Sequence, residues 1–285
     1  MFLALPLLAL AQGRLITAGD KAYENLAYAK AISNYERAFE NEVPDSSYAH
    51  KLAKSYLNVR DFKQAEVWYA RAVAMPNAKP IDYYDYAQAL RANGEYGEAD
   101  KWLRTYELQD TADSRGKRQA DASTYAAKLS ERAIPGCVVK DLASNTEQAD
   151  MGVAYYGNKA VFASSRTPDV AEFRRHTWNG QPFLDLYSAP VNADGEFGIA
   201  APIPALNTKY HESNAAFSPD GSTVWFTRNN YFKGKKGVTP QDEVNLKIYS
   251  RRLVNGKWTY EQPFTYNSDA SSVGHPALSA DGRTL

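Results

Sequence analysis

Small and large apolar residues recur every 34 positions through the first hundred residues. Within each interval they follow the 3.6-residue period of an amphipathic helix. A second period of 34 residues is typical of helix-pair repeats. A small residue lets two helices approach closely, and a large residue elsewhere in the repeat fills the neighbouring gap. The recurring positions are Gly19, Ala53 and Ala87; Ala31, Ala65 and Ala99; Tyr35, Tyr69 and Leu103; and Ala38, Ala72 and Tyr106.

Cap residues mark where these helices should begin and end. Asp61 precedes an apolar run and has Gln64 three residues later, which is typical of a helix N-terminus. Gly94 suits the left-handed end of a helix. A solenoid also needs a polar cap at its end. We therefore expect helix pairs near 15–41, 46–75 and 80–108, and a capping helix near 114–132.

The second half changes to short alternating strands separated by turn signals. Asp-Gly turns at 220–221 and 281–282 are 61 residues apart, and a similar turn lies at 156–158. Second hairpins follow, with strands expected at 184–188 and 246–250. Each unit thus has four strands in about 60 residues, which favours a β-propeller blade with long loops. An ordinary β-sandwich is the alternative.

The predicted fold class is multidomain, α then β: a tetratricopeptide α-solenoid followed by a partial β-propeller. The apolar run 1–11 has the length of a signal-peptide core and a small-x-small site before Gln12, although no basic residues precede it. A buried N-terminal helix is the alternative. Propellers usually need at least four blades, so we expect this chain to be a fragment of a longer one. The expected domains are 1–11 (signal peptide), 12–133 (solenoid with its capping helix) and 134–285 (about two blades and the start of a third).

Charge and motifs exclude several kinds of chemistry. Lys plus Arg and Asp plus Glu number 33 each, so there is no net charge to attract nucleic acid or an anionic membrane. Cys137 is the one cysteine, which excludes an intramolecular disulfide and a cysteine-based metal site. The sequence contains no G-x-S-x-G, H-E-x-x-H or P-loop motif. We predict no enzyme activity, no cofactor and no metal site.

Polar residues at the unit starts and turns have ordinary structural interpretations. His211 and His275 fall near blade starts, and His275 aligns with Asn214 of the preceding copy. We expect such a histidine to tie one strand to the next by a hydrogen bond. Asp220 and Asp281 are turn residues whose side chains should bond their own backbone.

One candidate binding surface is the face lined by the first helix of each pair, along which a tetratricopeptide solenoid binds. Arg and Lys on this face could hold a peptide carboxylate. A solvated helix face is an equally good interpretation. Projection from Ala53 and Ala87 gives the candidates His50, Lys54, Asn58, Tyr84, Gln88 and Arg91.

Two loops of the β half supply the other candidates. The loop 229–243 is basic and could meet an acidic partner or lipid headgroups. The loop 167–182 places a tryptophan near two arginines, residue types that dominate binding hot spots. Solvated loops are the ordinary interpretation of both. The candidates are Arg174, Arg175, Trp178, Lys233, Lys235 and Lys236.

The phrases NAAFSPDGSTVWFTRNN, VNLKIYSRRLVNGKW and SVGHPALSADGRTL, behind helical repeats, resemble the OmpA-family envelope proteins of Bacteroidetes-type bacteria. The resemblance covers essentially the whole chain. It implies a non-catalytic periplasmic scaffold at the outer membrane that binds envelope proteins, as in type IX secretion or gliding machinery. Peptidoglycan binding would belong to a C-terminal domain absent from these residues. The alternatives are an exported peptidase gated by its propeller, with a hydrolase domain beyond Leu285, and a ligand sensor using the propeller mouth.

Overall fold

The computed structural model divides into two units, each described by itself. The first comprises Met1–Val138 with Thr177–Gly180, and the second comprises Val139–His176 with Gln181–Leu285. Side chains are described from residue 11 onward. The residues that the structure describes are 4–40, 45–115, 138, 140–166, 175–240 and 243–285.

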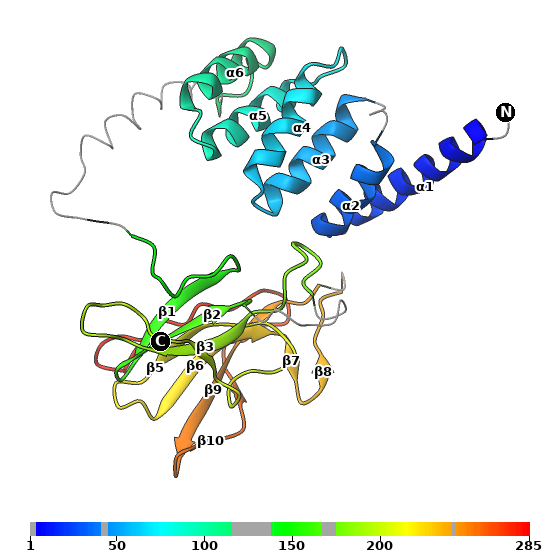
Figure 1. Cartoon of the computed structure of the whole chain (residues 1–285). Coiled ribbons are helices and arrows are strands. Elements are labelled where there is room, and N and C mark those ends of the chain that lie inside the picture. Colours follow the sequence, from blue (N-terminus) through cyan, green and yellow to red (C-terminus); the bar gives the residue numbers. More distant parts are fainter. Residues whose placement is uncertain (1–3, 41–44, 116–137, 139, 167–174, 241–242) are drawn as a thin grey trace. The chain divides into compact units, whose positions relative to one another are not determined.

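Within the described part of the first unit, helices form three pairs whose members pack against each other (Figure 1). The second helix of one pair also packs against the first helix of the next, so the pairs form a continuous stack. The pairs match the three spans predicted from the 34-residue period, apart from an earlier start of the first. The helices are α1 (Ala4–Glu24), α2 (Tyr28–Ala38), α3 (Ser46–Asn58), α4 (Phe62–Val73), α5 (Pro80–Ala92) and α6 (Tyr96–Gln109).

The residues that recur every 34 positions form the core of this stack. Ala31, Ala65 and Ala99 have no exposed surface, and Tyr35 is equally buried. A Cβ atom on Gly19 would lie 2.5 Å from Cε1 of Tyr35, so a residue without a side chain is required where this ring packs. The predicted tetratricopeptide-like packing of small against large residues is therefore present.

The predicted cap residues act as expected. The side chain of Asp61 accepts a hydrogen bond from the backbone N–H of Gln64 at 3.1 Å, which caps α4. Gly94 follows α5 with a φ of +87°, a conformation that favours glycine.

Helix α1 begins earlier than predicted. It starts at Ala4 and not near residue 15, so much of the apolar run is continuous with the first repeat helix. None of the described helices is both long enough and apolar enough to cross a membrane. Cleavage after Ala11 stays a prediction. The expected capping helix lies almost wholly on 116–137, outside the described residues.

Among its described residues, the second unit contains two successive large antiparallel sheets and the two-stranded sheet β7-β8 (Figure 1). Sheet 1 has the strand order β1-β2-β3-β4, which is the predicted four-stranded unit. Sheet 2 has the order β10-β9-β6-β5, with β11 also paired to β9. The strands are β1 (Asp150–Tyr156), β2 (Lys159–Ser164), β3 (Asp185–Pro190), β4 (Ala201–Pro202), β5 (Glu212–Phe217), β6 (Thr223–Asn229), β7 (Tyr231–Phe232), β8 (Lys235–Lys236), β9 (Leu246–Val254), β10 (Lys257–Trp258) and β11 (Gln262–Pro263).

The two turns that are 61 residues apart have the same hydrogen bonds. Ser218 accepts from the N–H of Thr223 at 2.9 Å, and Ser279 accepts from the N–H of Thr284 at 2.9 Å, in both cases through the hydroxyl. Asp220 accepts a backbone hydrogen bond inside its own turn, and Asp281 does the same, as predicted. The segment that starts at residue 275 therefore begins a third unit of the same kind.

Sheets 1 and 2 pack face to face over one core. Sheet 1 contributes Val161 and Leu186, and sheet 2 contributes Val224, Phe226 and Tyr249. The described residues do not close these sheets into a ring, so what they show is two stacked antiparallel sheets and the first segment of another.

Candidate functional site

A charged cluster joins α3 to α5 on the predicted binding face of the helical unit. Nδ1 of His50 lies 2.7 Å from Oδ1 of Asp82. Nζ of Lys54 lies 3.0 Å from Oδ2 of Asp85, and Nε2 of His50 lies 3.6 Å from the same oxygen. Both carboxylates are buried. Since buried carboxylates need partners, these pairs tie the second repeat to the third.

Tyr69 of α4 lies beneath this cluster. Its ring meets the His50 ring edge to face, with 5.5 Å between centroids. Burial raises the pKa of Tyr69 well above its ordinary value, and the neighbouring Asp85 carboxylate raises it further. The Tyr69 hydroxyl therefore stays protonated and contributes no charge to the face.

The same pairing occurs one repeat earlier with the charges exchanged. Nζ of Lys51 on α3 lies 2.6 Å from Oδ1 of Asp20 on α1. Asp20 and Lys54 are 34 residues apart and so occupy equivalent repeat positions, as do Lys51 and Asp85. Tyr35 also donates a hydrogen bond to Asp20, at 2.7 Å. Each first helix is thus bound to the next by an acid–base pair at the same place.

This pairing changes the prediction for Lys54. The sequence suggested a cation available to a peptide carboxylate, but Asp85 already occupies that role. An incoming carboxylate would have to exchange with Asp85. The sequence analysis overlooked Asp82 and Asp85; the available signal was the 31-residue spacing of Asp20 to Lys51 and of Lys54 to Asp85.

The other predicted residues of this face differ in their contacts. The Asn58 side chain donates to the carbonyl of Lys54 at 2.8 Å near the end of α3. The Tyr84 ring packs 5.3 Å from the Tyr106 ring and lies under the Arg115 guanidinium, 4.6 Å away. Gln88 and Arg91 are half-buried on α5. The structure thus brings His50 and Lys54 together, whereas Asn58 and Tyr84 have local structural roles.

The basic loop 229–243 is more ordered than predicted, because it contains the β7–β8 hairpin. Lys235 and Lys236 form β8, and Lys233 lies in the turn with its Nζ 5.2 Å from the Phe232 ring. All three lysines therefore lie on one small hairpin.

The other predicted loop is described only in part. Arg175 forms an antiparallel bridge with Pro182, so it is fixed at the base of the loop. Trp178 lies in Thr177–Gly180, the segment grouped with the helical unit, and is half-buried. Arg174 lies outside the described residues.

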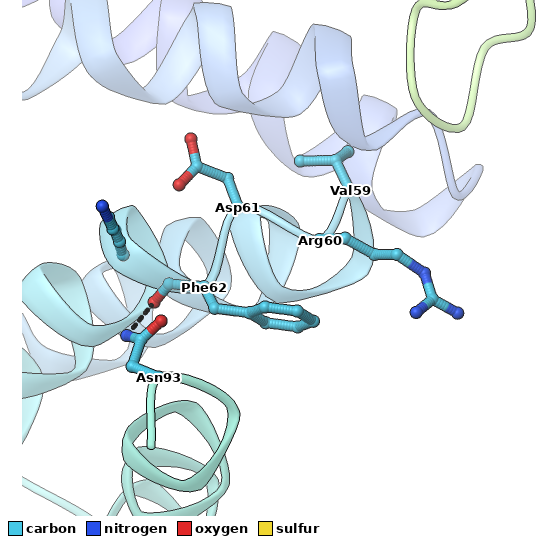
Figure 2. A pocket seen from close by; sticks show the side chains of 6 residues that line it. Val59, Arg60, Asp61, Phe62 and Asn93 are labelled. Atoms are coloured by element: carbon cyan, nitrogen blue, oxygen red, sulfur yellow. Dashed lines mark hydrogen bonds between the residues drawn. The ribbon is translucent and has the colours of Figure 1, made fainter. Parts of the chain in front are cut away.

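A hollow of about 420 Å³ lies at the turn between α3 and α4, beside the end of α5. Figure 2 shows side chains that line it. Its polar groups make hydrogen bonds where the second and third repeats meet. Asp61 caps α4, and the Asn93 side chain donates to the carbonyl of Phe62 at 3.0 Å and to Glu66 at 2.6 Å. The hollow is therefore a consequence of how two repeats meet.

Arg228 is the centre of a buried charge network in sheet 2. Its guanidinium makes a bidentate ion pair with Glu261, at 2.7 and 2.9 Å, and lies 4.2 Å from the Tyr249 ring centroid. Arg251 donates to Glu261 at 2.8 Å. Burial raises the pKa of Glu212, whose carboxylate lies 3.9 Å from Arg228, to about 8.

His211 and His275 link segments at the starts of successive units through their side chains, as predicted. Nδ1 of His211 accepts from the N–H of Leu184 at 3.0 Å, and Nδ1 of His275 lies 2.9 Å from Oδ1 of Asn214. Burial lowers the pKa of His211 to about 4, which keeps the ring neutral. Among the described residues, no group of three His, Cys, Asp or Glu side chains is placed to hold a metal ion.

No protein-family model matches this chain, and no curated protein is similar to it. Solved structures that are similar to part of it include two tetratricopeptide domains. The Arabidopsis OM64 TPR domain is 20% identical, over 43% of this chain and 96% of that one, with a TM-score of 0.35. The first TPR of Spaghetti (RPAP3) bound to the HSP90 peptide SRMEEVD is 18% identical, over 42% and 94%, with a TM-score of 0.38. Both TM-scores are below 0.5. The assignment to a tetratricopeptide-like class therefore rests on the 34-residue period of the sequence and on the pairing of the helices.

Proposed function

We propose that this chain is a non-catalytic scaffold that binds a protein partner along the first helices of its tetratricopeptide-like unit. The observation that carries the proposal is the set of half-buried polar side chains at equivalent positions of α3 and α5. His50 corresponds to Tyr84, and Lys54 corresponds to Gln88, each pair 34 residues apart. Stacked helix pairs commonly use such a continuous face for binding.

The chemistry of this face favours a partner segment that brings a carboxylate. His50 and Lys54 converge on Asp85, so a peptide acid that approaches them would compete with an internal carboxylate for the same donors. Arg91, one helical turn beyond Gln88, adds a further cation on α5. Because one carboxylate replaces another at the same donors, little net charge interaction is gained, and we expect this exchange to contribute little to the affinity.

We place this scaffold in the periplasm, associated with the outer membrane, in an assembly such as type IX secretion or gliding machinery. Support comes from the signal-like run 1–11 and from the resemblance of the strand phrases to OmpA-family envelope proteins. The stacked sheets would belong to a WD40-like propeller. A link to peptidoglycan would require a domain outside these residues.

The binding face is tested by capturing partners from an envelope extract with the chain and with the variant Arg91→Glu. We expect the variant to lose the partners that the parent chain holds. Arg104→Glu, an exposed change on α6, is the matched control and should retain them. Retention by Arg91→Glu, or equal loss from both variants, would remove this face from the proposal.

The proposed location has its own test. Expression in a Bacteroidetes-type host followed by N-terminal sequencing of the mature protein should give Gln12 as the first residue, with the protein in the periplasmic or outer-membrane fraction. Recovery of the uncleaved chain in the cytoplasm would contradict the location without affecting the binding face.

A further inference from the structure

The β7–β8 hairpin carries lysines on a turn of defined geometry. Residues 231–237 read YFKGKKG, with three lysines and no acidic residue. Lys233 and Gly234, which lie between the two strands, have φ of 49° and 77°. Positive φ at both central residues is the arrangement of a type I′ turn, whose twist matches that of a two-stranded hairpin. The backbone at the basic tip is therefore well defined.

Buried Arg228 anchors this hairpin to sheet 2. Its Nη2 donates to the carbonyl of Tyr231 at 2.7 Å. The next ring, that of Phe232, packs against the core shared by sheets 1 and 2, whereas Lys233 and Lys235 at the tip are exposed. The tip therefore offers charge without an apolar side chain that would enter a bilayer, so it suits a protein partner better than a membrane.

A second basic segment lies beside the hairpin, just before β5. The rings of Tyr210 and Tyr231 stack with 3.5 Å between centroids and 14° between planes, and Nζ of Lys209 lies 5.4 Å from the centroid of the Tyr210 ring. The N–H of Tyr210 donates to the Thr208 hydroxyl at 3.2 Å. The N–H and the hydroxyl of Thr208 both donate to buried Glu212, at 3.0 and 2.6 Å. Like the hairpin, this segment is therefore fixed to a buried charged residue of sheet 2.

The positive charge of these two segments is not required by the repeating contacts of the β unit. Lys209 and Asp269 each lie two residues after an asparagine that bonds to the neighbouring strand, so the equivalent position of the next unit has the opposite charge. Lys209, Lys233 and Lys235 form no ion pair within the described part of the chain. They lie where sheet 1 leads into sheet 2, and the sheets on both sides belong to the described residues.

We propose that the surface formed by Lys209, Tyr210, Tyr231, Lys233 and Lys235 binds an acidic segment of a partner protein. Carboxylates of this segment pair with the lysines, and its chain packs on the half-buried tyrosines, whose hydroxyls donate hydrogen bonds. The charges of the surface have one sign, and such complementarity sets partner choice and the rate of association. The surface belongs to the β unit, whereas the binding face proposed above belongs to the helical unit.

Fluorescence polarisation with a fluorescein-labelled oligoglutamate peptide tests this proposal on the whole chain. Every protein, the parent included, carries Arg91→Glu, which reverses a cation of the helical face and so keeps the two proposals distinguishable. We expect Lys209→Glu and Lys233→Glu each to weaken binding by about tenfold, because reversal turns an attraction into a repulsion. Lys257→Glu, an exposed change on β10 with the same effect on net charge, is the control and should bind as the parent does.

Two results would overturn the proposal. One is a parent chain that does not bind the peptide; if that chain instead pellets with phosphatidylserine vesicles, the lysines belong to a lipid-binding surface. The other is an equal effect of all three lysine variants, which would indicate a general response to net charge. Circular dichroism of each variant confirms that the fold is retained.

Discussion

Nδ1 of His275 lies 2.9 Å from Oδ1 of Asn214, although the two residues are 61 positions apart. They occupy the same place in successive units and both have left-handed backbone, with φ of 56° and 35°. Gly152 is the equivalent residue of sheet 1, and a Cβ atom there would lie 2.4 Å from Nδ2 of Asn214. The three positions thus touch in series, which fixes how each unit sits on the one before.

A valine at position 214 should destabilise the β unit more than a glycine. A β-branched residue at positive φ is strained by about 1–3 kcal/mol, whereas glycine adopts this conformation freely. Both variants lose the contact to His275. The difference between their unfolding free energies therefore reports the cost of placing a side chain at this backbone conformation. Urea unfolding of Asn214→Val and Asn214→Gly measures it. Equal stability of the two variants would show that the backbone at Asn214 carries no strain.

The helical half was predictable because its signal repeats. The positions of Ala31, Ala65 and Ala99 gave the period, and each is fully buried, since a repeated contact needs the same small residue each time. Asp61 and Gly94 gave local boundaries, because caps and left-handed turns depend on adjacent residues alone.

The charged cluster was not predictable with the same ease. Lys54 meets Asp85 only when α3 and α5 lie side by side, and that depends on how two repeats stack. The hairpin around Lys233 was missed because its strands have two residues each, too few to show alternation. Local sequence patterns were enough to predict most helices and strands. Contacts between elements that are distant in the sequence could be identified only from the structure.

The Lys54–Asp85 pair should show a measurable coupling energy. Asp85 is buried, so removing Lys54 leaves a carboxylate with less compensation, and we expect Lys54→Met to cost about 1–3 kcal/mol. A double-mutant cycle with Asp85→Asn, followed by urea unfolding, gives the coupling, which we expect near 1 kcal/mol.

The Glu98–Lys101 pair on α6 is the control for this cycle. Its side chains are 45% and 73% exposed, so solvent screens the interaction, and we expect no more than about 0.5 kcal/mol. A coupling at Lys54–Asp85 as small as that at Glu98–Lys101 would mean that the cluster does not join the repeats energetically.

Asn207 should be essential for the outer edge of sheet 1. Its Oδ1 accepts from the N–H of Leu186 at 2.8 Å, and its Nδ2 donates to the carbonyl of Leu186 at 3.0 Å. Asn267 makes the same two bonds to Ile248 in sheet 2. Replacing either asparagine by leucine leaves the backbone N–H of Leu186 or Ile248 unpaired, whereas the two carbonyls still accept from the N–H groups of Ile203 and Phe264 at 2.9 Å. One unpaired donor costs about 1–3 kcal/mol.

Thermal or urea unfolding of Asn207→Leu and Asn267→Leu measures this cost in each sheet separately. Replacement of the exposed Asn158 by aspartate is a suitable control, because that residue lies in a turn and its change should alter stability little. Wild-type stability in both leucine variants would show that other groups satisfy these strands.

Buried Glu212 should make the β unit less stable as pH rises. Burial raises the pKa of Glu212 from 4.5 to about 8, although hydrogen bonds from Thr208 and the charge of Arg228 act in the opposite direction. Between these two values the folded state holds a proton that the unfolded state has released. The free energy of unfolding therefore falls across this range, by up to about 1.4 kcal/mol per pH unit. Burial also raises the pKa of Asp185 from 3.8 to about 6, which adds a loss of the same sign at lower pH. Burial lowers the pKa of His211 from 6.5 to about 4, so its unfolded form holds a proton that the folded form has released, and this opposes the loss from Asp185.

Replacing Glu212 by glutamine isolates the contribution of this carboxyl group. Since the amide does not titrate, we expect unfolding free energies of Glu212→Gln to be nearly constant from pH 6.5 to 8, whereas at lower pH the unchanged Asp185 and His211 act in opposite directions. Urea titrations at each pH, followed by tryptophan fluorescence, give the comparison, and Glu147→Gln at an exposed site should keep the parent slope. A Glu212→Gln protein that loses stability between pH 6.5 and 8 as steeply as the parent would mean that Glu212 is ionised in the folded state, with Arg228 compensating fully for its burial.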